Sequence, residues 1–245
     1  YGVLRTEAKG NVRLEGCSIL ASGEYAVMSY GNTELLDSTI TGGRYGVRVS
    51  QGGDASFAMT GCTVTGTAYY GLYVSSLGTG AFSVEGNAFM ESGSYPISLN
   101  IGALRTGEEL EGIRENQFIG SKYSNGVLLY GTLANSIVLP EDTYFCESIT
   151  IPYGKTLQLS PGAKLLFRPN YGISLSGTLQ ALGTEEKKIV FSYAGDPSYV
   201  GAEEGSSTIE YWSGIRINDG GKLQASDCLF RYADTILNAY GMVSV

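Results

Sequence analysis

A short motif, seen in full as Tyr45-Gly46-Val47-Arg48-Val49, recurs along the chain and constrains its fold more than any other feature. From the first copy to the copy at Asn125, the starting residues lie 24, 20, 25, 25 and 30 residues apart. A repeat of roughly 20 to 50 residues indicates a stacked architecture, in which each unit buries its apolar face against the next one. Copies start at Tyr1, Tyr25, Tyr45, Tyr70, Tyr95, Asn125, Tyr171, Ser213 and Tyr240.

Each repeat predicts three short strands. Val47 and Val49 are expected to face inward and Arg48 outward, because side chains alternate along a strand. A second landmark follows, in which apolar residues flank a small corner, as in Leu14-Glu15-Gly16-Cys17-Ser18-Ile19. The sequence thus predicts one strand at the motif, one that ends at the corner and one that begins after it. No segment has the periodicity of a long helix, which argues against alternating strands and helices.

The corner carries a small polar residue that is expected to be buried. Its side chain can bond the backbone of the turn and the equivalent residue of the next coil, so we predict a ladder of these side chains. The ladder contains Cys17, Ser38, Cys62, Asn87 and Asn116. Glycine makes up 35 of the 245 residues, about twice the usual share, and it accepts a positive φ in tight turns. We therefore expect the glycine of the Tyr-Gly motif to mark a corner.

Charge and cysteine content exclude several functions. The net charge of -8 and the pI of about 4.7 argue against nucleic acid as a partner, because phosphates require a basic surface. No apolar run reaches the ~18 residues of a membrane span, so no membrane insertion is expected. The four cysteines form no C-x-x-C pair, which gives a zinc or redox site no support. Cys17 and Cys62 lie two coils apart, about 10 Å, so we predict buried free thiols.

A second array of repeats begins after an irregular junction near residues 131–148. Between Ile149 and Phe230 the chain contains two Pro/Gly turns, followed by Gly-Thr-Leu, Ala-Leu-Gly-Thr, Ile-Val-Phe-Ser and Trp-Ser-Gly-Ile. This succession resembles the right-handed parallel β-helix domains of large bacterial secreted and cell-surface proteins. Residues 1–132 resemble the repeat of the pectin-lyase-like superfamily more loosely.

The predicted fold class is therefore all-β, a right-handed parallel β-helix solenoid of about ten coils with three short strands per coil. We expect a first β-helix array at 1–132 and a second at 133–245, with one continuous solenoid as the alternative. The resemblance implies a secreted or cell-surface location but leaves activity open, because this fold carries lyases, hydrolases, adhesins and inert stalks. Since Tyr1 falls inside one repeat and the chain stops within another, we also expect it to be part of a longer chain.

The enzymes that this resemblance implies use histidine, paired carboxylates or acidic calcium ligands. The chain has no histidine and neither an Asn-Thr-Asp nor an Asp-Asp segment. The predicted outward row of the first strands has no carboxylate, which argues against a calcium-dependent lyase. No catalytic residue, metal site or cofactor is therefore predicted. This row contains Leu4, Met28, Arg48, Tyr73, Ser98, Leu128, Ser174 and Arg216.

Acidic residues gather in two loops instead. Their spacing is not the alternating spacing of a calcium loop, so we expect solvated charge and no metal site. One loop contains Glu108, Glu109 and Glu111, and the other contains Asp196, Glu203 and Glu204.

The 18 tyrosines are the most unusual side chains, and those of the motif are expected to stack about 4.8 Å apart. In one interpretation the stack covers a corner of the core and keeps each hydroxyl in water. In the other it forms an aromatic strip that binds sugar rings, helped by Tyr69, Leu4 and Met28. Trp212 is expected to pack at the corresponding corner of the second array. The candidate ligand-binding residues are Tyr25, Tyr45, Tyr70, Tyr73, Tyr95 and Arg48.

Three functions follow from these alternatives. The first is a non-enzymatic segment of a secreted or surface-anchored bacterial protein, with an adhesin or stalk role. The second is a carbohydrate-binding module that uses the tyrosine ladder, with a polysaccharide or a host or cell-surface glycan as its partner. The third is a polysaccharide lyase or glycoside hydrolase. The missing histidine and the carboxylate-free row weigh against the third, and exposure of several rings in a row distinguishes the second from the first.

Overall fold

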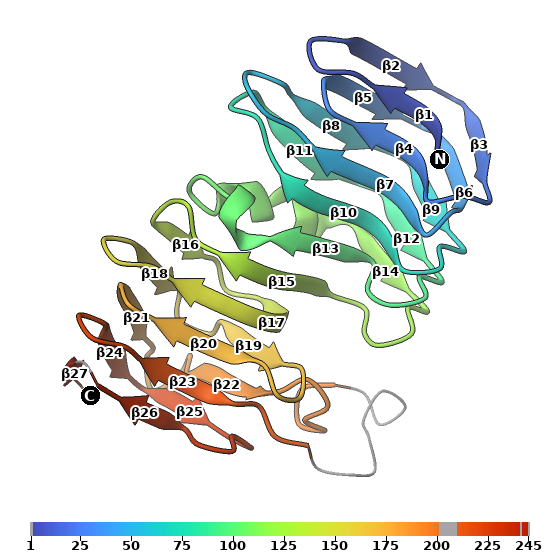
Figure 1. The fold of residues 1–245 in the computed structure, drawn as a ribbon. Coiled ribbons are helices and arrows are strands. Elements are labelled where there is room, and N and C mark those ends of the chain that lie inside the picture. Colours follow the sequence, from blue (N-terminus) through green and yellow to red (C-terminus); the bar gives the residue numbers. More distant parts are fainter. Residues whose placement is uncertain (1, 201–209, 241, 245) are drawn as a thin grey trace. The chain divides into compact units, whose positions relative to one another are not determined.

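The computed structural model describes residues 2–200, 210–240 and 242–244, and it shows an all-β chain of parallel strands (Figure 1). The strands wind into a parallel solenoid of about ten coils, which confirms the fold class that the repeat predicts. Two compact units make up the chain. Unit 1 contains residues 1–103 and 109–127, and unit 2 contains residues 104–108 and 128–245.

Unit 1 is built from coils of three strands. The first strand of each coil joins sheet A, the second joins sheet B and the third joins sheet C, with parallel neighbours throughout. Sheet A contains β1 (Gly2–Thr6), β4 (Tyr25–Ser29), β7 (Tyr45–Ser50), β10 (Tyr70–Ser76) and β13 (Ile97–Asn100). Sheet B contains β2 (Asn11–Glu15), β5 (Asn32–Leu36), β8 (Phe57–Thr60) and β11 (Phe82–Glu85). Sheet C contains β3 (Ser18–Ala21), β6 (Thr39–Gly42), β9 (Thr63–Thr65), β12 (Ala88–Met90) and β14 (Gln117–Ile119). In sequence, β13 is followed by the 3-10 turns η1 (Ile101–Ala103), η2 (Glu108–Leu110) and η3 (Gly112–Glu115).

Unit 2 differs from unit 1 because the two halves of one long strand pair with two different strands. The first half of β17 (Thr143–Ile151) pairs with β19 (Lys164–Phe167), and its second half pairs with β20 (Gly172–Leu175). The row of β19 continues through β22 (Ile189–Tyr193) and β25 (Cys228–Phe230). The row of β20 continues through β23 (Gly214–Ile217) and β26 (Leu237–Ala239). A separate sheet contains β16 (Ile137–Leu139), β18 (Thr156–Leu159), β21 (Thr178–Leu182), β24 (Lys222–Ser226) and β27 (Met242–Ser244), and β15 (Val127–Thr132) lies next to β17.

The corner between sheets B and C carries the predicted ladder of small polar residues. Asn116 accepts a hydrogen bond from the backbone N–H of Asn87 at 2.9 Å, and Asn87 accepts one from the backbone N–H of Cys62 at 2.9 Å. The hydroxyl of Ser38 accepts the backbone N–H of Cys17 at 3.0 Å in the same way. These bonds satisfy buried backbone groups that the sharp turn leaves outside the sheets. The residue before each of four ladder positions has a positive φ, at Gly16, Asp37, Gly61 and Gly86.

In the copies that start at Tyr45 and Tyr70 the glycine of the motif does not mark a corner, so that expectation is wrong there. Gly46 and Gly71 lie inside β7 and β10, are buried, and have no positive φ. A Cβ atom on Gly46 would lie 2.5 Å from Cγ1 of Val64, and one on Gly71 would lie 2.7 Å from the ring of Phe89. Glycine is therefore needed here because the neighbouring chain leaves no room for a side chain.

The first coil is paired one residue away from the register that the motif suggests. Gly2 pairs with Tyr25, Leu4 with the inward-facing Val27, and Arg5 with Met28. The placement of Leu4 in the outward row is therefore wrong, and Tyr1 lies outside the described residues. The outward row of sheet A in unit 1 consists of Arg5, Met28, Arg48, Tyr73 and Ser98, which still includes no carboxylate.

Two further expectations about positions need correction. Met28, which is level with Arg5 and Arg48 in the register, is only 1% exposed, so it offers no apolar surface. Tyr240 is not a copy of the motif tyrosine. Ile217 pairs with Ala239, which places Tyr240 after the end of β26.

Stacked aromatic rings fill the core of unit 2. Trp212 is fully buried, and its ring stacks on Phe167 at 4.8 Å and on Phe191 at 6.3 Å. Its indole N–H donates to the carbonyl of Arg231 at 2.8 Å. Phe191 in turn stacks on Phe230 at 4.8 Å, which continues the column to the last coil.

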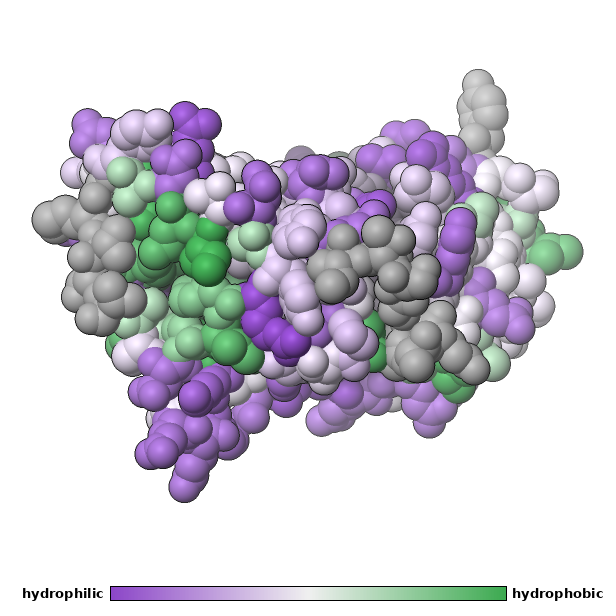
Figure 2. Space-filling view, turned by 90° about the horizontal axis from the view of Figure 1, so that it is seen from below, coloured by the Kyte–Doolittle hydropathy of each residue, from purple (hydrophilic) through white to green (hydrophobic). Residues whose placement is uncertain are grey.

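Figure 2 shows apolar residues gathered at the end of unit 2 that carries β25 and β26. There the side chains of Leu229 and Ile236 are 38% and 44% exposed. Throughout the described residues, none of the helical segments has the length and apolar character needed to cross a membrane.

Candidate functional site

Four tyrosine rings meet on the surface of unit 1 at the start of β7 and β10. Tyr45 and Tyr70 are level in the register, and their rings stack with centroids 5.8 Å apart. Tyr73 stacks on Tyr45 at 5.0 Å, and Tyr69 meets Tyr70 edge-on at 5.2 Å. We call these four residues the tyrosine cluster. Tyr69 is 44% exposed and the other three are half-buried, so part of every ring faces solvent.

The tyrosine cluster leaves out two of the predicted ligand-binding residues. Tyr25 is level with Tyr45, but its ring lies over Gly2, and no ring contact joins it to the cluster within the described part of the chain. Tyr95 is 2% exposed and packs on Tyr123 at 5.9 Å. Tyr25 is thus separate from the four rings of the cluster, and Tyr95 is buried and offers no exposed face to a ligand.

Two arginines lie over the rings of the cluster. The guanidinium of Arg44 is 5.4 Å from the centre of the Tyr45 ring and 5.2 Å from that of Tyr69. The guanidinium of Arg48 is 5.5 Å from the centre of the Tyr73 ring. Each contact of this kind contributes about 0.5–1 kcal/mol at an exposed site. The arginines therefore help to hold the rings in place while remaining near the surface.

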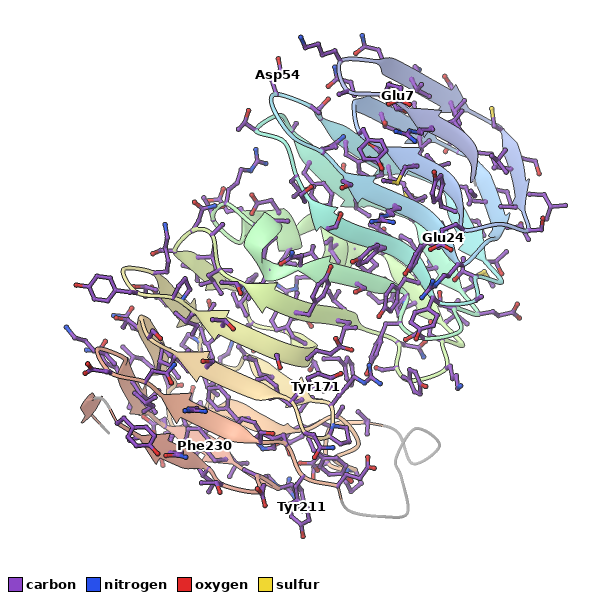
Figure 3. All side chains as sticks on the ribbon, viewed as in Figure 1. Glu7, Glu24, Asp54, Tyr171, Tyr211 and Phe230 are labelled. Atoms are coloured by element: carbon purple, nitrogen blue, oxygen red, sulfur yellow. The ribbon has the colours of Figure 1, made fainter. Side chains whose placement is uncertain are left out.

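Sequence reasoning did not identify Arg44 as part of the site. It occupies the repeat position just before the motif tyrosine, where Glu24 stands one coil earlier and Tyr69 one coil later. Glu24, labelled in Figure 3 near the start of β4, forms an ion pair of 3.5 Å with Arg44. The signal that could have revealed it was the residue preceding each motif tyrosine, read from coil to coil.

Arg48 differs from Arg44 because no carboxylate balances its charge. Its Nε atom is buried without a hydrogen-bond partner, and the structure gives it no ion pair among residues 2–200, 210–240 and 242–244. Burial raises the pKa of the Tyr45 phenol above its ordinary value, and the nearby Arg44 opposes that shift in part. The phenol is thus protonated at neutral pH, and the cluster offers aromatic faces, hydroxyl groups and one unbalanced cation.

The expectation of solvated charge in the second acidic loop is wrong for Asp196. This carboxylate is fully buried, accepts a hydrogen bond from the hydroxyl of Ser192 at 2.6 Å and another from the backbone N–H of Ser198 at 2.9 Å, and lies 3.4 Å from Arg231. Its hydrogen-bonding capacity is used internally, so it anchors the loop and is closed to a ligand. Glu203 and Glu204 lie outside the described residues.

Other candidate chemistry is sparse. Glu108 and Glu111 are exposed and Glu109 is half-exposed, in keeping with solvated charge. Across the part of the chain that the structure describes, no cluster of three His, Cys, Asp or Glu residues could hold a metal ion.

All four cysteines are free, as predicted, although Cys17 and Cys228 are only half-buried. Burial raises the pKa of the Cys62 and Cys146 thiols and raises that of Cys228 to about 11. These three side chains are therefore neutral thiols at physiological pH and not nucleophilic thiolates.

Comparison with known proteins gives a family and no individual relative. Residues 3–139, more than half of the 245 residues, match the family described as "Right handed beta helix region". Neither the search of curated proteins nor the search of solved structures found a match. The match covers unit 1 and its corner ladder, and the parallel solenoid agrees with it. The chain therefore belongs to the right-handed β-helix family.

Proposed function

We propose that this chain is a non-enzymatic adhesive segment of a secreted or cell-surface bacterial protein, and that it contacts glycans through the tyrosine cluster. The observation that supports this role is the grouping of four partly exposed rings with Arg44 and Arg48. Aromatic rings present large rigid faces at low conformational cost, and a phenol adds a hydrogen-bonding group at the edge of each face. A sugar ring, with one apolar face and hydroxyls around its rim, complements such a surface.

The unbalanced charge of Arg48 indicates which glycans would bind best. A guanidinium forms paired hydrogen bonds with a carboxylate, and these bonds are stronger than those between neutral groups. The half-buried position of Arg48 beside Tyr73 limits screening by solvent. We therefore expect acidic sugars to bind more tightly than neutral sugars at the tyrosine cluster.

The test is binding of the purified chain to an array of neutral and acidic glycans, followed by titration of the best ligand. Tyr69→Ala combined with Tyr73→Ala should weaken binding by about tenfold or more, which corresponds to ~1.4 kcal/mol. Tyr153→Ala is the matched control, because Tyr153 is 84% exposed, belongs to a turn of unit 2 and is not part of the tyrosine cluster. Its binding should equal that of the unmodified chain.

Two results would contradict the proposal. Binding that survives the double substitution would show that the rings only cover a corner of the core, and a stalk role would then replace the adhesive one. Turnover of a uronic-acid polymer by the purified chain would contradict the non-enzymatic part. The mutual packing of Tyr45, Tyr70 and Tyr73 is the observation that favours the stalk alternative, because the rings bury part of their area on one another.

A further inference from the structure

A groove of about 600 Å³, lined by both polar and apolar residues, lies on the outward face of sheet B in unit 1. It runs across β2, β5, β8 and β11, so every coil of the sheet contributes to it. Figure 3 labels Asp54 in the loop between β7 and β8, at the opposite end of the strands from Glu24. The groove is therefore separate from the tyrosine cluster, which lies at the Glu24 end.

The groove exists because side-chain size changes abruptly along one row of the sheet. Arg13, Glu34, Ala58 and Ser83 are level with one another in successive strands and point outward. The first two side chains are long and the last two are short. A hollow therefore opens over Ala58 and Ser83, with the charged pair as its wall.

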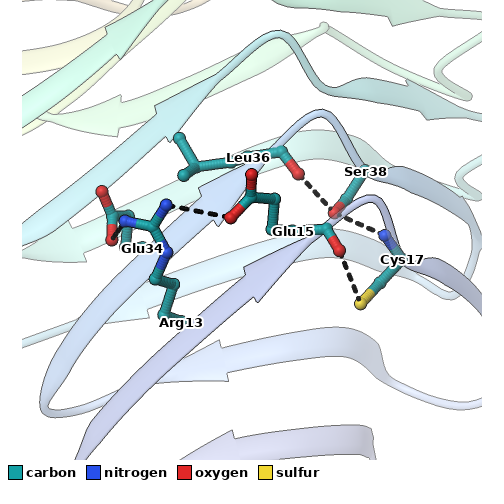
Figure 4. A network of polar contacts seen from close by, with 6 residues as sticks. All are labelled: Arg13, Glu15, Cys17, Glu34, Leu36 and Ser38. Atoms are coloured by element: carbon teal, nitrogen blue, oxygen red, sulfur yellow. Dashed lines mark hydrogen bonds and ion pairs between the residues drawn. The ribbon is translucent and has the colours of Figure 1, made fainter.

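The wall is held in place by hydrogen bonds and ion pairs. Arg13 contacts Glu34 at 2.7 Å and Glu15 at 2.9 Å, as Figure 4 shows. Beside them, the side-chain amide of Asn32 donates to the Oδ1 atom of Asn11 at 2.6 Å. An exposed ion pair adds little stability by itself, but pairs that share a partner and a register restrict one another's rotamers.

The loop that borders the groove is also anchored. The buried side-chain amide of Gln51, in the loop between β7 and β8, donates to the carbonyls of Gly31 and Ser56, both at 2.8 Å. On the other side, the carbonyl of Gly53 accepts the backbone N–H of Thr79 at 2.7 Å. The loop is thereby tied to the coils before and after it. A ligand would enter a groove whose shape is already formed, which lowers the entropic cost of binding.

The chemistry of the lining points to an uncharged ligand with many hydroxyl groups. Arg13 and Glu34 balance each other, so the groove carries no excess charge to attract a phosphate or carboxylate. Val12, Ala58 and Ala81 alternate with polar residues in its lining, so apolar and hydrogen-bonding groups lie side by side, as they do on a sugar ring. Within the described residues, the amide nitrogen of Asn11 and the hydroxyl of Ser83 have no protein partner, and the amide, carboxylate and hydroxyl groups together supply donors and acceptors.

We propose that this groove binds a neutral saccharide chain that lies across the strands of sheet B. The short side chains of Ala58 and Ser83 allow a sugar ring to approach the sheet, and Asn11, Asn32 and Glu34 then reach its hydroxyls. Because successive strands repeat every ~4.8 Å, the groove presents equivalent polar positions along the length of such a chain. This site is independent of the tyrosine cluster, and either could bind without the other.

The test is titration of the ¹⁵N-labelled chain with maltohexaose, cellohexaose and mannohexaose, followed by two-dimensional NMR. At least one of these neutral probes should shift the side-chain amide signals of Asn11 and Asn32. Ala58→Trp, which fills the hollow, should weaken that binding by about tenfold or more. Thr60→Trp is the matched control, because Thr60 points outward from the same strand two residues later and does not line the groove.

Each outcome shows whether or not a saccharide binds in the groove. If none of the three probes shifts the Asn11 and Asn32 amide signals at millimolar concentration, the proposal is wrong. Equal affinity in the Ala58→Trp and unmodified chains would also overturn it, and the amide signals of the unmodified chain keep the test valid if that variant does not fold. Tyr69→Ala combined with Tyr73→Ala should leave binding in the groove unchanged, so failure of the adhesive function and failure of the groove are distinguishable.

Discussion

Individual residues in the motif have different structural roles, although they recur together as one repeat. Val47 and Val49 are fully buried and supply the apolar interior, while Gly46 keeps open the space that Val64 fills. Burying a valine side chain stabilises the fold by about 1.5–3 kcal/mol, so the main role of the motif is to pack the interior. Tyr45 and Arg48 remain available to meet a ligand, because the Tyr45 ring is partly exposed and Arg48 faces outward with an unbalanced charge.

Gly71→Ala should destabilise the chain by about 1–3 kcal/mol, since the added methyl group would meet the ring of Phe89 at 2.7 Å and the carbonyl of Pro96 at 2.8 Å. Urea denaturation followed by circular dichroism would measure the change. Gly52→Ala is the matched control. Gly52 is exposed with open space around it, so the free energy of unfolding should change by less than about 0.5 kcal/mol. Equal losses in the two variants would contradict the packing explanation.

The strands of unit 1 are joined at the corner by side chains that act as substitutes for backbone partners. Asn87→Ala should cost about 2–3 kcal/mol, because it leaves the buried N–H of Cys62 without its acceptor and removes the bond that the Asn87 amide donates to the carbonyl of Met59. Asn87→Ser should cost less, since Ser38 shows that a serine hydroxyl can accept the equivalent backbone N–H. Thermal unfolding of both variants would measure the difference. Indistinguishable melting temperatures would show that the corner amide does not contribute in this way.

The elements also show which features the sequence could predict and which it could not. The three strands per coil and the corner ladder depend on residues close together in the chain, so the repeat reveals them. The register of β1 could not be read from its motif, because it depends on how Tyr25 packs over Gly2. The burial of Asp196 was missed for a similar reason, since its partner Arg231 lies far away in sequence.

The two candidate sites also differ in how far the sequence could predict them. The motif predicted Tyr45 and Tyr70, because identical positions in successive coils stack, and the outward row of the first strands predicted Tyr73. The groove on sheet B was not predicted, since its shape depends on the size of the side chains that neighbour one another across β5 and β8. Comparing the outward positions of the second strand in each coil would have revealed the step from Glu34 to Ala58.

For the whole molecule, the solenoid means that each coil depends mainly on its two neighbours. In unit 1, the inward residues of β2 are half-exposed, whereas Leu35 of β5 and Met59 of β8 are fully buried. Hydrogen exchange measured by mass spectrometry should therefore be slowest in β7 and β8. It should be fastest at the outer coils, in β1 and β2 of unit 1 and in β25 and β26 of unit 2. Uniform protection along each unit would instead indicate a single cooperative opening.

The loops between sheets A and B have a consequence for how recognition could diverge. Only Tyr30 and Gly31 separate β4 from β5, whereas residues 51–56 separate β7 from β8, yet the strands on both sides keep their pairing. Insertions at these turns would therefore leave the packing of the interior unchanged. Lineages that share this scaffold could thus change what they bind by altering turn length alone, and binding specificity would evolve faster than the coils that carry it.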